Sequence, residues 1–197
     1  MIGALIGGMA ESAKRQGSTN YTPKYAGLKD KNFAVVVAAD RSIQADNPSI
    51  VSIVTTEMTQ RLADHAGAKG VLPAMEVLKY QSQRPGWVAK PLSELAKDLG
   101  VERVVYVDLQ DFALTDPGNP YVYNGVAAGT IHVIEVESQV STEFAFTEPV
   151  HVKYPDMTGM SSNQMPRNRV FEELARRFIE RSAWMFYEHE ESNVIKY

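Results

Sequence analysis

Residues 90–112 read KPLSELAKDLGVERVVYVDLQDF, and this stretch decides the predicted fold. Pro91 is suited to the start of a helix and Gly100 to its end. Between them apolar residues recur at helical spacing, which predicts one buried face formed by Leu92, Leu95, Ala96 and Leu99. The valine-rich run over 104–109 then predicts a strand. A helix that leads directly into a buried strand is typical of an α/β domain.

The segments before this stretch supply a second strand and a second helix. Residues 33–40, FAVVVAAD, form a continuous apolar run, which predicts a strand covered on both faces. Residues 47–67 begin with an Asn-Pro pair suited to a helix start and carry one apolar stripe, which predicts an amphipathic helix packed on the sheet. We also expect a short strand over 71–72 and a short helix over 75–81.

The segments after it complete a mixed sheet. Residues 125–138 and 142–155 alternate between apolar and polar positions, which predicts an antiparallel hairpin with one buried face. Residues 166–187 predict a last helix, with Leu174 and Phe178 on its buried face. The fold class is therefore α/β, with the order β-α-β-α-β-β-β-α. We expect a single mixed sheet packed with helices, with parallel pairings early and an antiparallel meander late.

The ends of the chain differ in composition from its centre. We expect four segments: an apolar N-terminal arm over 1–16, a linker over 17–32, a single α/β domain over 33–187 and a C-terminal tail over 188–197.

The arm is uncharged over its first ten residues. It is too short to span a bilayer, which takes ~20 apolar residues. One interpretation is a disordered arm. The other is packing against a neighbouring subunit or a membrane surface, with close approach through its glycines. The apolar residues available for that contact are Ile2, Leu5, Ile6 and Met9.

The composition argues against several classes of protein. The 197 residues carry a formal net charge of −4, so the chain lacks the electrostatic footprint of a nucleic-acid binder, and we expect no nucleic-acid partner. The absence of cysteine excludes disulfides, cysteine nucleophiles and thiolate metal sites. His132 and His151 lie on the predicted hairpin, where they can approach one another. Two strand histidines without a third ligand favour a structural role, so we expect no metal and no cofactor.

Three acidic residues are the candidates for catalysis. Asp108, Asp111 and Asp116 surround the end of a predicted strand, and a carboxylate cluster there can be catalytic. The other interpretation, which we favour, is that Asp108 faces solvent or pairs with a lysine and that Asp116 starts a turn. The sequence contains neither a nucleophile elbow nor a phosphate-binding loop. We therefore predict no catalytic residue and a protein that is not an enzyme.

Several aromatic residues lie in or beside predicted loops: Tyr80, Trp87, Tyr121 and Tyr123. Aromatic residues at such places either plug the end of the core or anchor a partner. Trp87, Tyr121 and Tyr123 therefore join the apolar residues of the arm as interface candidates. A small-ligand or peptide-binding module that uses these aromatics is the alternative function.

Two segments resemble a known family. Residues 90–112 resemble the proline-started helix, glycine stop and strand of a group of small bacterial envelope lipoproteins, and residues 131–138, IHVIEVES, resemble their following strand. The strand over 33–40 and the helix after it stand where that group has them. The group belongs to a superfamily that includes the curli-secretion channel lipoprotein, the amino-terminal domain of TolB and the ring lipoprotein of Pel polysaccharide export.

The resemblance implies a non-enzymatic structural or accessory subunit of a secretion, export or envelope complex, in the periplasm or at the outer membrane. It also implies self-assembly into a ring or another homo-oligomer, with other envelope proteins as partners. Those lipoproteins carry a lipidated cysteine after a signal peptide, and this sequence contains none. Either the numbered chain starts beyond that cysteine, which places residues 1–10 close to the membrane, or this protein is not a lipoprotein.

Overall fold

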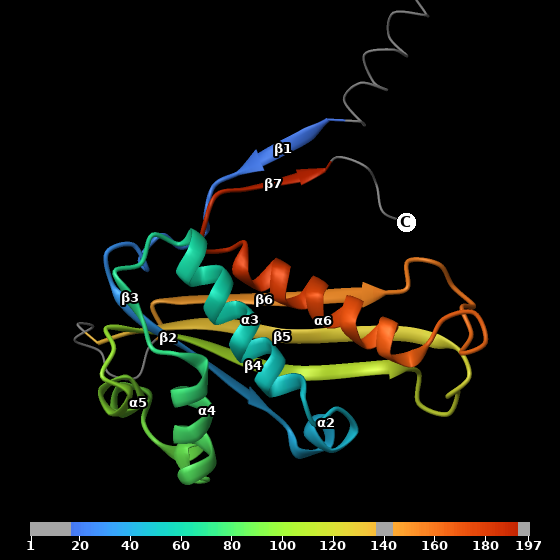
Figure 1. The fold of residues 1–197 in the computed structure, drawn as a ribbon, viewed down its shortest axis with the longest axis horizontal. Coiled ribbons are helices and arrows are strands. Elements are labelled where there is room, and N and C mark those ends of the chain that lie inside the picture. The colour runs from blue at the N-terminus through green and yellow to red at the C-terminus, as the bar shows by residue number, and fades with distance from the viewer. Residues whose placement is uncertain (1–16, 137–143, 193–197) are drawn as a thin grey trace, which may run out of the picture.

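The structure, a computed structural model, describes residues 17–136 and 144–192. It confirms the predicted class, because a mixed sheet of five strands is packed with helices (Figure 1). Within the described residues no helix is long and apolar enough to cross a membrane.

The strand order in the sheet is β3-β2-β4-β5-β6. The strand β2 (Asn32–Ala39), second in this order, is parallel to both of its neighbours, β3 (Gly70–Val71) and β4 (Arg103–Thr115). The pairings of β4 with β5 (Tyr123–Glu135) and of β5 with β6 (Phe146–Tyr154) are antiparallel. Parallel pairings therefore come first and the antiparallel meander last, as predicted.

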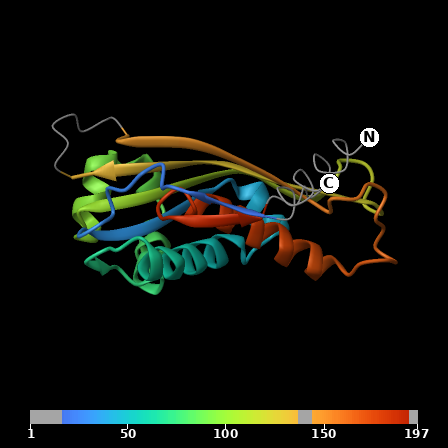
Figure 2. The same cartoon turned by 90° about the horizontal axis from the view of Figure 1, so that it is seen from above.

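One face of the sheet is covered by two long helices, α3 (Ile50–His65) and α6 (Arg167–Ala183), as Figures 1 and 2 show. The larger hydrophobic core lies between these helices and the sheet. Leu174 and Phe178 are fully buried in it, and both were predicted core residues. Their spacing of four residues places both side chains on the same side of α6.

The other face of the sheet is only partly covered. The helices α4 (Ala74–Gln83) and α5 (Leu92–Leu99) and the short 3-10 helix η1 (Trp87–Ala89) contribute to a smaller core against β2 and the start of β4. Beyond these elements, alternate side chains of β5 and β6 are half-buried or exposed.

The helix α5 follows the prediction made from residues 90–112. Leu95, Ala96 and Leu99 are buried, while the side chain of Leu92 lies outside the described part of the structure. Gly100 ends the helix in the left-handed conformation, with φ of 66°. A residue without Cβ adopts this conformation at no steric cost, so the sequence determines where the helix ends.

A second, separate sheet forms where we predicted the linker and the tail. The strands β1 (Ser18–Tyr21) and β7 (His189–Ser192) pair antiparallel, and we call these two strands the ribbon. After β1 the chain returns to the body, where Leu28 is fully buried and the Tyr25 amide donates to the Met185 carbonyl at 2.9 Å. Parts of both terminal segments are therefore structured, while the division of the chain into four segments stays a prediction.

Two further elements differ from the predictions. The short helix α2 (Arg41–Asp46) follows β2 directly and was not predicted. The strand β4 continues to Thr115, well beyond the predicted end at Leu109, and its register with β5 shifts between Leu109 and Asp111. A β-bulge at that point adds one residue to β4 and interrupts the alternation from which strands are predicted.

The packing of α6 leads to a prediction about stability. We expect Phe178→Ala to lower the free energy of unfolding by about 3–5 kcal/mol, because it removes a fully buried aromatic side chain. Chemical denaturation measures the change. Met75→Ala is the control, since Met75 is 74% exposed on α4. A loss below about 1 kcal/mol for Phe178→Ala, well under the cost of such a deletion, would mean that α6 does not pack as described.

Candidate functional site

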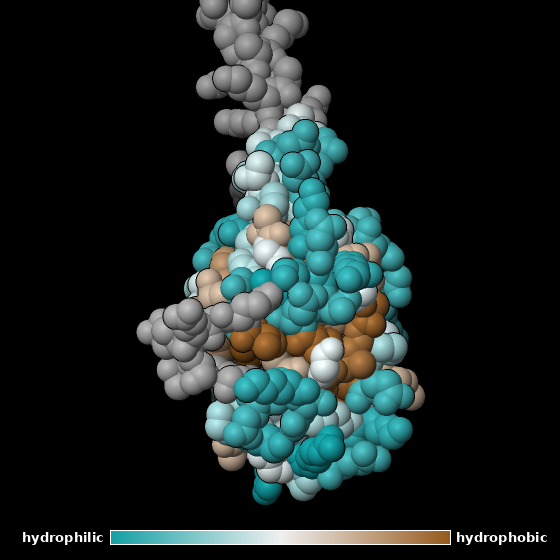
Figure 3. Space-filling view, turned by 90° about the vertical axis from the view of Figure 1, so that its left-hand side faces the viewer, coloured by the Kyte–Doolittle hydropathy of each residue, from teal (hydrophilic) through white to brown (hydrophobic). Residues whose placement is uncertain are grey.

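The ribbon stands away from the sheet and helices. Figure 1 shows it rising from the upper side of the body, above α6 and β6, and Figure 3 shows it as a narrow and mostly hydrophilic projection. All four residues of β1 are exposed, including Tyr21. An isolated two-stranded ribbon is marginally stable in water, so this one requires an anchor.

A stacked column of side chains anchors the ribbon to the end of α6. The ring of Tyr21 stacks on His189 with centroids 5.5 Å apart, and His189 stacks on Trp184 at 4.7 Å. The Arg181 guanidinium lies 5.1 Å from the centre of the Trp184 ring, where the cation interacts with the aromatic face. Arg181 also donates to both carboxylate oxygens of Glu191 at 2.8 Å.

Below this column lies a cavity of about 430 Å³ between the ribbon, β6 and α6. Its lining includes His151 and Trp184 together with charged side chains from α6, from β7 and from the loop after β1. Those charges are already paired: Lys24 contacts Glu148 at 2.5 Å, and Arg181 contacts Glu191. The cavity is therefore a polar groove whose charged side chains already form ion pairs within the protein.

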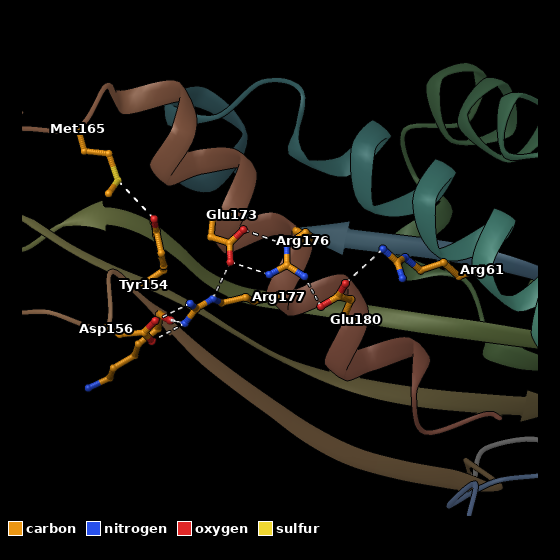
Figure 4. A network of polar contacts seen from close by, with 9 residues as sticks. Arg61, Tyr154, Asp156, Met165, Glu173, Arg176, Arg177 and Glu180 are labelled. Carbon is orange, nitrogen blue, oxygen red and sulfur yellow. Dashed lines mark hydrogen bonds and ion pairs between the residues drawn. The ribbon is translucent and has the colours of Figure 1, made fainter. Parts of the chain in front are cut away.

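A network of ion pairs covers the exposed side of α6 (Figure 4). Arg176 donates to Glu173 at 2.6 Å and to Glu180 at 2.5 Å, and Arg61 of α3 lies 3.6 Å from Glu180. Arg177 makes a bidentate contact with Asp156 at 2.6 Å. The network joins α6 to α3 and to the loop after β6.

The network determines the charge state of its central carboxylate. The Arg176 guanidinium, supported by Arg177, holds the pKa of Glu173 below its ordinary value against the opposing effect of partial burial. The pKa of Arg177 is raised, mainly by its hydrogen bonds to Asp156. Each charge in this group is matched by an opposite charge, which is the arrangement of a structural network.

The partly open face of the sheet carries the predicted acidic candidates. The β-bulge places Asp108 opposite Thr130 and Asp111 opposite Ala128, so both carboxylates project from this face. Asp108 accepts a hydrogen bond from Gln110 at 2.9 Å. Asp116 lies in the following loop and accepts one from Asn124 at 2.7 Å. These are the ordinary contacts of solvated strand and turn residues.

The two hairpin histidines lie on the same face but do not meet. His132 is opposite Thr147 and hydrogen-bonds its hydroxyl at 2.9 Å, while His151 lies four residues further along β6. At ~3.3 Å per residue this separation is about 13 Å, too far for one ion. His132 stacks on Phe144 at 3.9 Å, and burial lowers its pKa. Among the described residues there is no group of three or more acidic or histidine side chains that could hold a metal.

The structure separates the loop aromatics. Trp87 packs in the smaller core beside Tyr106, and Tyr123 belongs to the larger core, with exposed fractions of 9% and 5%. Tyr80 is also buried and donates to Asp98 at 2.8 Å. Tyr121, in contrast, is 75% exposed. Of these four side chains only Tyr121 is open to a partner, and its role in an interface stays a prediction.

The other interface candidates, Ile2, Leu5, Ile6 and Met9, lie outside the described residues. The described part of the chain offers a different set at the ribbon, which sequence reasoning missed: Tyr21, Arg181, Trp184 and His189. In the sequence only Trp184 indicated this site. It lies at the end of the last helix, one residue away from the positions of the buried apolar stripe.

A second exposed surface lies at one end of the body. Figure 3 shows a band of hydrophobic residues there between hydrophilic surfaces. Val71 of β3 and Val136 after β5 lie at this end of the sheet and are each 37% exposed. A continuous hydrophobic surface is typical of a contact site.

Comparisons with known proteins show a shared fold. No family model matches the sequence, and no curated protein matches it. The subunit of a PelC dodecamer from Paraburkholderia phytofirmans is 11% identical, with a TM-score of 0.50 over 87% of this chain and 98% of that chain. Lipoprotein GNA1162 from Neisseria meningitidis is 12% identical, with a TM-score of 0.48 over 77% of this chain and 97% of that chain. This chain therefore shares its overall fold with the PelC subunit.

The network on α6 leads to a prediction about pH. We expect Glu173→Gln to lower the free energy of unfolding near neutral pH by about 1 kcal/mol, the upper range for a partly exposed ion pair. The Glu173 pKa is lower in the folded chain than its value of about 4.3 in an unfolded one. The stabilisation is therefore complete above that unfolded value and is lost as the pH falls through the folded one.

Denaturation of both proteins between neutral and acidic pH measures this effect. Glu172→Gln is the matched control, because Glu172 is exposed on the same helix. A difference between wild type and Glu173→Gln that persists at the lowest pH would contradict the assignment.

The hairpin histidines lead to a prediction about metal content. Because His132 and His151 are too far apart to share an ion, we expect no tightly bound transition metal on them. Elemental analysis of purified protein tests this. Stoichiometric zinc that is lost in a His132→Ala variant would overturn it.

Proposed function

We propose that this protein is a non-enzymatic subunit that assembles with itself in the bacterial cell envelope, in the periplasm or at the outer membrane. The observation that carries the proposal is the fold, which is shared with the subunit of a PelC dodecamer over 87% of this chain. The resemblance of residues 90–112 and 131–138 to envelope lipoproteins supports the same location. Its role is that of an accessory component of a secretion, export or envelope complex, with other envelope proteins as partners.

The surface of the body supports self-association. The exposed ribbon, the hydrophobic band in Figure 3 and the exposed Tyr121 are features of a subunit surface. The enzymatic alternative, which the sequence did not favour, has weaker support, because Asp108 and Asp116 make ordinary hydrogen bonds. The small-ligand or peptide-binding alternative has one favourable observation, the cavity below the ribbon, whose charged side chains already pair with one another.

Light scattering of the full chain tests the proposal. We expect a discrete mass that is a multiple of 21.9 kDa, because closed symmetric assemblies are the common form of self-association. A chain that stays monomeric at high concentration, with and without detergent, would contradict the proposed function.

A second prediction concerns the arm. We expect removal of residues 1–16 to leave the domain folded and to weaken assembly or membrane association. Each large aliphatic side chain buried in a contact contributes roughly 1.5–3 kcal/mol, offset in part by the ordering of the arm. Circular dichroism checks the fold, and light scattering and liposome flotation check the association. An unchanged mass and unchanged flotation would assign the arm no part in either contact.

A further inference from the structure

We propose that neighbouring subunits join through the ribbon, with β1 of one copy pairing antiparallel with β7 of the next. This inference rests on the proposed self-assembly and adds to it the contact surface and the order of the strands. Repeated around a ring, the junction makes one continuous antiparallel sheet from all the ribbons.

Among the described residues, each strand of the ribbon has one edge without a strand neighbour. The ribbon is a separate sheet of two strands, so in the described part of the chain β1 and β7 each have one strand neighbour. No described strand therefore pairs with the outer edge of either β1 or β7. Such an edge is a template for another strand.

The stacked column at the base of the ribbon fixes the orientation of the ribbon before any partner binds. Tyr21, His189, Trp184 and Arg181 stack in sequence and connect the ribbon to the end of α6. The ribbon therefore projects in a defined direction, clear of the body, as both Figure 1 and Figure 3 show. A surface that is ordered before binding loses less conformational entropy when the partner arrives.

The side chains favour a junction between unlike strands. β7 carries Glu190 and Glu191, while β1 consists of Ser, Thr, Asn and Tyr and carries no charge. A β7 to β7 junction would place carboxylates of two copies beside each other, which is destabilising. A β1 to β7 junction instead places hydroxyl and amide donors against carboxylates. The ribbon already contains such a contact, because the Ser18 hydroxyl donates to Glu190.

Symmetry favours the same junction. A β1 to β1 junction would pair two copies and leave both β7 edges open. Rotation about a ring axis along the ribbons keeps every ribbon in the same orientation, so that β1 of one copy meets β7 of the next antiparallel. Each subunit then uses both edges, and the closed ring leaves none exposed.

Cysteine cross-linking tests the junction in a favourable background, because the 197 residues of this sequence contain no cysteine. Full-length copies carrying Asn20→Cys are co-expressed with full-length copies carrying Glu190→Cys, with a different tag on each. Each copy has one thiol, so any disulfide joins two chains. The structure of one ribbon does not determine which residues of β1 and β7 would face each other between two copies. Copies carrying Thr19→Cys are therefore also co-expressed with copies carrying Glu191→Cys.

We expect at least one β1 with β7 combination to give the mixed disulfide in several-fold excess over both homodimers. Met75→Cys is the matched control, since Met75 is 74% exposed on α4, and it should cross-link only at background level. If light scattering shows an assembly but the mixed disulfide is at background in every combination, the ribbon junction is overturned and self-assembly stands. Homodimers in excess would also overturn it. A monomeric full chain would overturn the proposed function and the junction together.

Discussion

The burial of β2 on both faces is the constraint on which the rest of the structure depends. Val35, Val36 and Val37 have almost no exposed surface, and they belong to the two different cores in alternation. A strand of this kind is stable only with a neighbour on each edge and a helical layer on each face. β3 and β4 supply the edges. α3 and α6 form one layer, and α4 and α5 form the other.

The sequence patterns that indicate this buried strand and its neighbours each lie within a short stretch of the chain. Most of the body could therefore be predicted. The run over 33–40 and the helix and strand over 90–112 show their periodicity within a few residues, and their caps lie beside them. The ribbon is different. Its strands are polar, have no alternating pattern and pair residues as far apart as Ser18 and Ser192. No short window of sequence contains a pairing of that kind.

The residues of the candidate site also divide into those that a short stretch of sequence indicates and those that depend on distant parts of the chain. Tyr21 and His189 stack although they come from opposite ends of the chain, and the aromatic character of each residue alone does not predict the contact. The opposite outcome holds for Trp87 and Tyr123, which lie beside predicted loops yet complete the cores. Position relative to a loop indicates where an aromatic residue lies along the chain. Whether it is buried depends on the elements that pack over it, such as η1 against the sheet.

The ribbon also determines how the molecule responds to mechanical force. Ser18 and Ser192 are paired at its outer end, so the chain enters and leaves the described structure at the same point. A pull between the two termini would open the ribbon one residue pair at a time, from Ser18 towards Tyr21. A pull on the N-terminal side against the body would run along β1 to Tyr25 and the fully buried Leu28. Tension applied on the N-terminal side would therefore reach the core through β1, and the four residue pairs between β1 and β7 would share the load.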